Sequence, residues 1–159
     1  MANDSFQKAL SYAYKLLSYR DRSSKEMHER IVRKGFPEDI AVDVISYLKE
    51  RGFLNDEKLA EGLHAYAINK KHLGRSGVKK YLVSRGIPTE IIETLYDSDN
   101  DYLEAAKRLA EKRLRHMKEH DLAAKKIKIR HMLLRRGFPF DVINKAIKSI
   151  QLEEGKNGH

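Results

Sequence analysis

The chain has 159 residues, of which 41% are hydrophobic and 35% are charged, and its formal net charge is +9. It contains no cysteine, which excludes a disulfide framework and thiol chemistry. No apolar run approaches the ~20 residues of a membrane span, and the N-terminus lacks the apolar core of a signal peptide, so we expect a cytoplasmic protein.

Apolar residues recur at helical spacing along the chain, and no stretch alternates at the two-residue period of a strand, so we predict an all-α fold. The first helix is expected over residues 5–19. Residues 23–26 (Ser-Ser-Lys-Glu) form a capping box, in which the serine accepts from the third N–H and the glutamate reaches back. The helix that follows is predicted to run to about Lys34. A third helix opens after Pro37 and ends at Gly52.

Three further helices are predicted in the middle of the chain. The first begins at the N-cap pair Asn55-Asp56 and ends at Leu73-Gly74. The second follows directly, and the third opens after Pro88. The polar segment 97–101 is predicted to break the chain before the last group of helices.

The last group begins with a long helix that ends near Lys118. Asp121 is predicted to cap the next helix, and Pro139 opens the final one. The tail, residues 153–159, is expected to fray. We therefore predict about nine helices in three groups of three, covering residues 1–52, 53–98 and 99–152.

One short motif occurs three times at a constant spacing of 51 residues. Residues 34–37 (Lys-Gly-Phe-Pro), 85–88 (Arg-Gly-Ile-Pro) and 136–139 (Arg-Gly-Phe-Pro) contain the three prolines of the chain. Glycine after a helix takes the left-handed conformation and proline opens the next helix, so each copy is predicted to be a helix–turn–helix corner. A period near 50 residues is typical of a repeated unit. We expect three tandem three-helix repeats in an elongated, curved array.

Each corner follows an apolar pair at the same spacing: Ile31/Val32, Leu82/Val83 and Leu133/Leu134. Both members of the first pair are expected to face inward, as parts of the apolar stripe of their helix.

The charge is distributed unevenly. Residues 1–52 carry a net +2, residues 53–103 a net −1 and residues 104–159 a net +8. Six basic groups and no acidic ones lie between Lys70 and Arg85. Such islands are typical of proteins that bind a polyanion or a protein assembled on one. We predict that the contact residues are Arg20, Arg22, Lys70, Lys71, Arg75, Lys79, Lys80, Arg113, Arg115, Lys125, Lys126, Lys128 and Arg130.

Four segments, in order and at matching spacings, resemble the RecX regulatory family. Residues 20–27 look like its R-x-R-S-x-x-E-L segment, and residues 34–36 look like its K-G-[FV] corner. Residues 54–60 look like its L-x-D-x-x-[FY]-A segment, and residues 74–87 look like its G-x-x-x-I-x-x-x-L-x-x-K-G-I segment. One departure is that Lys70-Lys71 stand where the family has an arginine.

The resemblance implies a fold and a function. Members of this family are elongated all-helical proteins of three-helix repeats, which bind the RecA recombinase filament on single-stranded DNA within its helical groove. They usually inhibit its ATPase, strand-exchange and co-protease activities. No cofactor or catalytic residue is associated with that role. The implied partners are therefore the RecA filament and single-stranded DNA, bound directly or through RecA, and we expect a monomer.

A nonspecific nucleic-acid-binding helical-repeat protein is the alternative that fits the same charges. Tyr12, Tyr14 and Tyr19 could stack on bases, whereas we expect Tyr66 and Tyr81 to pack in the core. Sequence-specific DNA reading is disfavoured, because the opening turn after each proline carries an acidic residue where a recognition helix needs neutral or basic side chains. A generic helical scaffold with another partner shares the same fold.

An enzyme is the third alternative. Residues 116–120 match the H-x-x-E-H pattern of one metalloprotease class. The match falls at a predicted helix junction, and the surrounding lysines and arginines repel a dication. We therefore predict no metal site, no cofactor and no catalytic activity.

Overall fold

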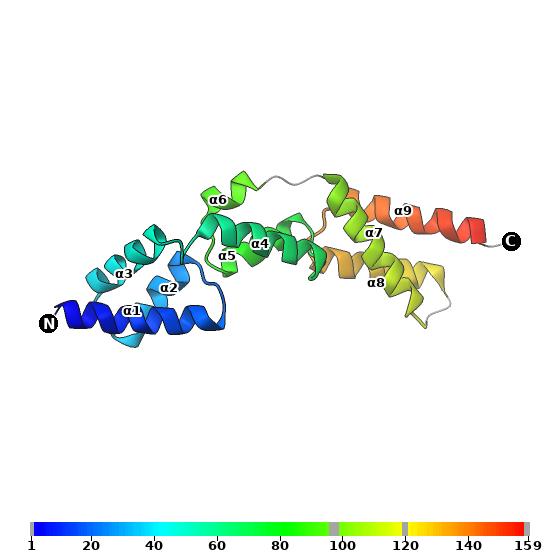
Figure 1. The fold of residues 1–159 in the computed structure, drawn as a ribbon. Coiled ribbons are helices and arrows are strands. Elements are labelled where there is room, and N and C mark those ends of the chain that lie inside the picture. Colours follow the sequence, from blue (N-terminus) through cyan, green and yellow to red (C-terminus); the bar gives the residue numbers. More distant parts are fainter. Residues whose placement is uncertain (1, 96–98, 119–120, 158–159) are drawn as a thin grey trace. The chain divides into compact units, whose positions relative to one another are not determined.

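A computed structural model of the chain describes residues 2–95, 99–118 and 121–157. Within these ranges the chain forms helices and no strand, which confirms the all-α prediction (Figure 1). The nine helices are α1 (Ala2–Tyr19), α2 (Ser24–Lys34), α3 (Glu38–Glu50), α4 (Asp56–Asn69), α5 (Arg75–Ser84), α6 (Thr89–Thr94), α7 (Asp99–Arg115), α8 (Leu122–Arg135) and α9 (Phe140–Asn157).

The three predicted corners are confirmed, and they share one pattern of backbone hydrogen bonds. Gly35 N–H donates to the Val32 carbonyl (3.0 Å), and Phe36 N–H donates to the Ile31 carbonyl (3.4 Å). The corners at Gly86 and Gly137 repeat both bonds at the corresponding residues. The three glycines have φ of 114°, 81° and 92°, in the left-handed region that glycine enters without strain. We call them the first, second and third corners.

The apolar pair before each corner divides between core and surface. The first members, Ile31, Leu82 and Leu133, are at most 1% exposed. The second members are exposed by 40%, 47% and 52% in Val32, Val83 and Leu134 respectively. The expectation that Val32 faces inward is therefore wrong, because adjacent residues lie about 100° apart around a helix and the narrow inner stripe holds one of them.

The capping box of α2 forms only in part. Ser23 Oγ accepts a hydrogen bond from the Glu26 N–H (3.0 Å), as predicted. The Glu26 carboxylate does not reach back as predicted but accepts hydrogen bonds from the Arg20 guanidinium. The Glu26 carboxylate pairs with Arg20 rather than with the Ser23 N–H because two hydrogen bonds from a charged guanidinium are stronger than one from a neutral backbone N–H. The predicted cap of α8 is confirmed, since Asp121 accepts from the Ala123 N–H (3.0 Å).

Three predicted helix bounds differ from the structure. Helix α4 ends at Asn69 rather than at Leu73-Gly74, because the Leu73 N–H folds back to the Ala67 carbonyl (3.0 Å). Helix α7 begins at Asp99, inside the predicted polar break. Helix α9 continues to Asn157, so part of the expected tail is helical, while the flexibility of the tail stays a prediction.

The chain folds into two compact units. Unit 1 comprises Met1–Leu63 and Leu82–Thr94, and unit 2 comprises His64–Tyr81 and Leu95–His159. The boundaries between the units therefore fall within α4 and within α5, so the middle group of helices is divided between the two units. The partition into repeats at residues 52 and 98 stays a prediction.

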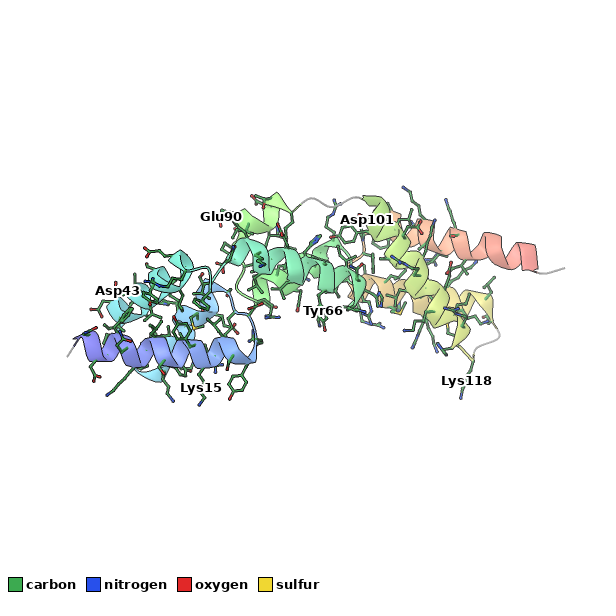
Figure 2. All side chains as sticks on the ribbon, viewed as in Figure 1. Lys15, Asp43, Tyr66, Glu90, Asp101 and Lys118 are labelled. Atoms are coloured by element: carbon green, nitrogen blue, oxygen red, sulfur yellow. The ribbon has the colours of Figure 1, made fainter. Side chains whose placement is uncertain are left out.

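In unit 1, helices α1 to α3 enclose the core, while Lys15 and Asp43 point away from it (Figures 1 and 2). The second corner packs against the start of α2, where a Cβ atom on Gly86 would overlap the Ser23 hydroxyl. Ser24 N–H donates to the Asp56 carboxylate (2.8 Å), which satisfies another donor at this helix end. The core side chains of unit 1 include Ala9, Leu10, Ala13, Leu16, Met27, Ile31, Ile40, Ala41, Val44, Leu48 and Leu54.

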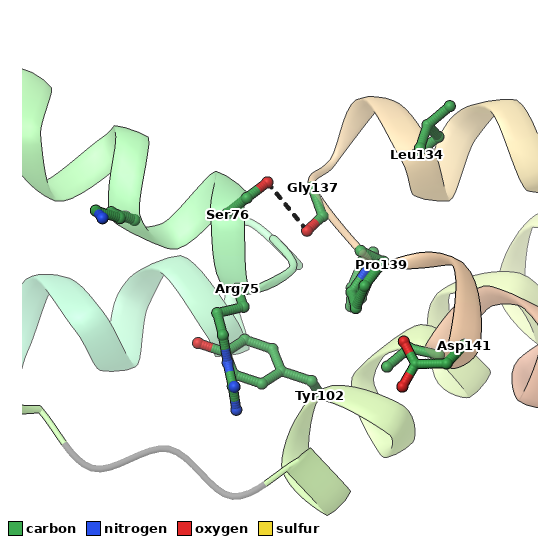
Figure 3. A pocket seen from close by; sticks show the side chains of 10 residues that line it. Arg75, Ser76, Tyr102, Leu134, Gly137, Pro139 and Asp141 are labelled. Atoms are coloured by element: carbon green, nitrogen blue, oxygen red, sulfur yellow. Dashed lines mark hydrogen bonds between the residues drawn. The ribbon is translucent and has the colours of Figure 1, made fainter.

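In unit 2, α7 packs against α9 and α8, and the third corner packs against the start of α5 (Figure 3). Gly74 N–H donates to the Arg136 carbonyl (2.8 Å). Ser76 donates to the Gly137 carbonyl through both its N–H and its hydroxyl, each at 3.3 Å. Backbone carbonyls of the third corner thus accept hydrogen bonds from N–H groups at the start of α5.

Three glycines make this junction possible. A Cβ atom on Gly74 would overlap the backbone of Gly137, and one on Gly77 would overlap the Arg136 carbonyl oxygen. A Cβ atom on Gly137 would in turn overlap the backbone nitrogen of Gly77. Two backbones therefore touch directly at this point, with no room for a side chain between them.

Adding a methyl group at Gly77 should destabilise unit 2. Relief of the overlap needs backbone movement, so we expect Gly77→Ala to lower the free energy of unfolding by about 1–3 kcal/mol. Gly62→Ala is the matched control, because Gly62 lies in α4 with nothing within 4 Å of an added Cβ. The control should gain about 0.5–1 kcal/mol. Urea unfolding followed by circular dichroism measures both; a Gly77→Ala protein as stable as wild type would contradict the contact.

Candidate polyanion-binding surface

The net positive charge of the chain belongs to one of its two units. Unit 2 contains 20 lysines and arginines against 10 aspartates and glutamates, a net charge of +10. Unit 1 contains 12 against 13, a net charge of −1. An electrostatic attraction to a polyanion therefore acts on unit 2.

The two predicted contact residues of unit 1 serve its fold. Arg22 is 8% exposed, and its Nε donates to the Leu16 carbonyl (3.2 Å) while a terminal nitrogen lies 3.5 Å from the Glu26 carboxylate. Burial, followed by the charge of Arg20, lowers the pKa of the Arg22 guanidinium. Arg20 is exposed and pairs with the same Glu26. Arg22 is thus used within the protein, and we do not carry it forward as a contact for a partner.

The other eleven predicted residues belong to unit 2. Lys125 and Lys126 are partly buried near the start of α8. The remaining nine side chains are exposed: Lys70, Lys71, Arg75, Lys79, Lys80, Arg113, Arg115, Lys128 and Arg130.

The imidazole of His72 is influenced by the charges of cations from several segments of unit 2. Its φ of 53° is left-handed, which is uncommon for a side chain with a Cβ, and the residue is partly buried in the turn after α4. Burial lowers the pKa of its imidazole, and the charges of Arg136, Lys112, Arg108 and Lys70 lower that pKa further. We call these five residues the His72 cluster.

Lys70 was among the predicted contact residues, and sequence reasoning missed the other four members of this cluster. Arg108 and Lys112 lie one helical turn apart on α7, and Arg136 belongs to the third corner. The Arg136 guanidinium donates a hydrogen bond to the Lys71 carbonyl, which fixes it beside the turn. The spacing of four between Arg108 and Lys112 places them on one helix face, but no local signal says which face meets residue 72.

Two tyrosines adjoin the cluster through Lys71. The rings of Tyr66 on α4 and Tyr81 on α5 lie 6.4 Å apart between centroids, and Lys71 Nζ lies 5.1 Å from the centre of the Tyr81 ring. Tyr66 is 48% exposed and projects outward from α4 (Figure 2). The expected core packing is therefore wrong for Tyr66, whereas Tyr81 is partly buried.

The tyrosines of unit 1 offer less free ring surface, apart from Tyr19. Tyr12 is partly buried against Phe36 (6.5 Å), and Tyr14 meets the edge of Phe53 (5.3 Å). Tyr19 is 72% exposed at the end of α1.

A second feature of unit 2 is an open pocket of about 580 Å³ beside the third corner (Figure 3). Its lining includes the apolar residues Phe138 and Val142 and the ring of Tyr102. The Arg75 guanidinium lies 5.3 Å from the centre of the Tyr102 ring. Since a cation over a ring face is held by the ring's quadrupole, this contact orients Arg75 at the pocket edge.

The metalloprotease alternative gains no support from the described residues. Within the described ranges no group of three or more histidines or carboxylates could hold a metal ion. His116 follows the end of α7, while Glu119 and His120 lie outside the described residues. Among the helices that the structure describes, none is both long enough and apolar enough to span a membrane.

Two family models match the chain. Residues 9–48 match the model described as the first three-helix domain of RecX, and residues 99–147 match the model of its third three-helix domain.

Relatives match over most of the chain. Regulatory protein RecX of Chlorobium limicola is 30% identical over 147 residues, which cover 92% of this chain and 92% of that protein. Regulatory protein RecX of Bacillus velezensis is 36% identical over 158 residues, covering 94% of this chain but 58% of that protein. The chain thus spans a little more than half the length of the Bacillus relative.

Solved structures share the fold. A crystal structure of RecX from Lactobacillus salivarius matches with a TM-score of 0.82 and 29% identity, covering 94% of this chain and 99% of that one. A second crystal structure, of a regulatory protein RecX, matches with a TM-score of 0.79 at 23% identity, covering 92% of this chain and 74% of that one.

Acid should destabilise unit 2 through His72. Since its folded-state pKa lies below the ordinary value of 6.5, the unfolded chain binds the proton more readily. Stability present above pH 6.5 is therefore lost as the pH falls through 6.5 toward the folded-state pKa. His72→Asn removes this titration and tolerates the left-handed backbone. Thermal melts at about pH 7.5 and about pH 5.5 should show a larger fall in Tm for wild type than for the variant; equal falls would argue against a depressed pKa.

Proposed function

Because the chain belongs to the RecX family of regulatory proteins, we propose that it binds the RecA filament on single-stranded DNA and lowers its ATPase, recombinase and co-protease activities. The concentration of positive charge in unit 2 carries this proposal. A nucleoprotein filament is a polyanion, so a unit with a net charge of +10 is drawn to it at long range, and salt weakens that attraction.

Binding alone accounts for the regulation in this proposal. A body of helical repeats presents an extended surface, and such a surface can contact several subunits of a polymer at once. Occupying the filament in this way blocks the addition of subunits or loosens those already bound. The protein then needs neither a catalytic residue nor a cofactor, and it acts as a monomer.

A nonspecific nucleic-acid-binding function is the second candidate. Lys71 lies over the Tyr81 ring, and the exposed Tyr66 ring adjoins Tyr81; this favours it, because accessible ring surface near a cation suits a base and its phosphate. The two functions are compatible, since the filament contains single-stranded DNA.

ATP hydrolysis by RecA filaments separates the two candidates. We expect the protein to inhibit hydrolysis at concentrations well below that of the filament's DNA sites, and to lose this effect as salt rises. Inhibition that begins only when the free DNA is saturated would instead favour simple competition for DNA. Regulation of RecA is excluded for this chain if hydrolysis stays unchanged at every ratio.

Reversing two charges on α5 should weaken filament binding without unfolding the protein. Lys79 and Lys80 are both exposed in unit 2, so Lys79→Glu with Lys80→Glu should reduce the affinity about tenfold. The control carries Lys15→Glu and Lys49→Glu, an equal change on exposed positions of unit 1. Filament co-sedimentation and circular dichroism measure both effects; equal losses in the two double variants would mean that net charge alone matters.

A further inference from the structure

The pocket beside the third corner is lined by apolar side chains that an attraction to phosphate does not explain. Phe138 and Val142 line its buried part, and Leu134, near the end of α8, lines it with a side chain that is 52% exposed. All three residues belong to unit 2. The volume of about 580 Å³ falls within the ~300–1,000 Å³ of pockets that bury most of a small ligand. The pocket is therefore large enough for a long side chain together with the groups beside it.

Contacts within unit 2 hold the walls of this pocket in place. The Ser76 hydroxyl on α5 donates to the Gly137 carbonyl (3.3 Å), which joins the α5 wall to the third corner. The contact between the Arg75 guanidinium and the Tyr102 ring joins the same wall to α7. A site that is formed before its ligand arrives loses little conformational freedom on binding. A short segment can therefore bind here without remodelling the pocket.

The walls of the pocket carry opposite charges. Arg75 and Lys79 contribute two cations from α5, whereas Asp141 contributes a carboxylate from the first turn of α9. Arg75 and Asp141 are well separated from each other along the pocket (Figure 3). An occupant that suits both walls needs a negative charge toward α5 and a hydrogen-bond donor toward α9.

A peptide segment meets these requirements better than a nucleic acid or a fatty acid. A peptide has aliphatic side chains for the apolar lining, carboxylates for the α5 wall, and backbone N–H donors for Asp141. A nucleic acid has no aliphatic side chain, and Asp141 repels its phosphates. The Tyr102 ring is 2% exposed, so it offers no face on which a base could stack. A fatty acid brings the chain and the carboxylate but no donor for Asp141.

We propose that this pocket docks a segment of a protein partner in which a leucine-like aliphatic side chain adjoins a carboxylate. The aliphatic group packs on Phe138 and Val142, the carboxylate faces Lys79, and a backbone N–H of the segment donates to Asp141. The site deepens the proposed function and rests on it for the source of the segment, which is a RecA subunit. It gives this chain a contact with protein that is separate from the attraction of unit 2 to phosphate.

The test uses the full chain with isotope-labelled leucine and valine methyl groups, and the acetylated peptide Gly-Asp-Leu-Glu-Gly as the probe. Titration followed by NMR should shift the methyl resonances of Leu134 and Val142, with a Kd of about 1 mM or tighter. A peptide with glycine in place of its leucine should bind at least about fivefold more weakly. A peptide with asparagine and glutamine in place of its acids should bind about threefold more weakly.

Two variants, each with a matched control, test the two halves of the pocket. Leu134→Ser should weaken peptide binding about fivefold, read from the Val142 methyl groups. Its control is Val32→Ser, because Val32 is the exposed second member of the apolar pair before the first corner and belongs to unit 1. Lys79→Gln should weaken binding about threefold, whereas Lys148→Gln, on an exposed position of α9 outside the pocket lining, should not. Circular dichroism checks that each variant is folded.

RecA filaments test the source of the segment. Leu134→Ser should raise about fivefold the protein concentration needed to inhibit ATP hydrolysis, and Val32→Ser should inhibit like wild type. A Leu134→Ser protein that has lost peptide binding but inhibits like wild type would overturn the assignment to a RecA subunit. Peptide binding in the expected pattern by a wild type that leaves RecA hydrolysis unchanged contradicts the proposed function and leaves the pocket standing as a peptide site.

Three other results would overturn the pocket itself. The first is no methyl shift in wild type at about 10 mM peptide. The second is equal binding of the leucine and glycine peptides, or equal peptide binding by Leu134→Ser and Val32→Ser. The third is a loss of oligothymidylate binding in Leu134→Ser as large as its loss of peptide binding, because the pocket would then take DNA.

Discussion

The close approach of a glycine corner to the start of a neighbouring helix is the contact on which this fold depends. It occurs once in each unit, and the two examples use different chemistry. The second corner meets the Ser23 hydroxyl, whereas the third corner meets the bare backbone of Gly74 and Gly77. Ser23 and Gly74 are 51 residues apart, which is also the spacing of the two corners. Nothing lies within 4 Å of a Cβ built on Gly35, so the first corner makes no such contact.

This contact also determines where charge can be used. The start of a helix ordinarily attracts anions, because its first N–H groups lack partners. In α5 the third corner supplies carbonyl partners to Gly74 and Ser76, so this glycine-rich turn is not available to a phosphate. Attraction to an anion must come instead from side chains, and the same corner provides one. Arg136 immediately precedes Gly137, so the backbone contact that fixes the glycine also fixes the guanidinium beside Lys71.

Local sequence patterns predicted the features that local physics controls. The corners, the N-caps at Ser23 and Asp121, and the burial of Ile31, Leu82 and Leu133 each follow from a few neighbouring residues. The candidate site was predicted less well, because its geometry depends on contacts between distant segments. Arg22 lies in a basic segment yet packs under α1, and no neighbour in sequence signals that the Leu16 carbonyl will accept its Nε.

The same limit explains the residues that sequence reasoning missed. Arg136 reaches the turn after α4 only because the third corner packs beside that turn, and the charge of Arg108 on α7 acts on the His72 imidazole from another segment. Tyr66 and Tyr81 show why an apolar stripe predicts burial imprecisely. The stripe is about 100° wide, so the sequence does not say whether a residue lies at its centre or at its margin. Tyr66 lies at the margin of its stripe, so about half of its side chain remains on the surface.

Comparison of the two junctions shows where selectivity for a polyanion can reside. Around the second corner, Arg30, Arg33 and Arg85 share a pocket with Glu26 and Glu29, so cations and anions are mixed there. The residues that lie 51 positions further along the chain correspond to those of the second corner. Gly77 corresponds to Glu26, Lys80 corresponds to Glu29, and Arg136 corresponds to Arg85. The backbone design is thus kept and these two carboxylates are absent, while Asp141 is the acidic residue that lines the pocket beside the third corner. The family arginine expected before Gly74 is represented by Lys70 and Lys71, and the guanidinium at this place comes from Arg136, far along the chain. A planar donor is therefore present despite the local substitution, because the fold brings it from the third corner.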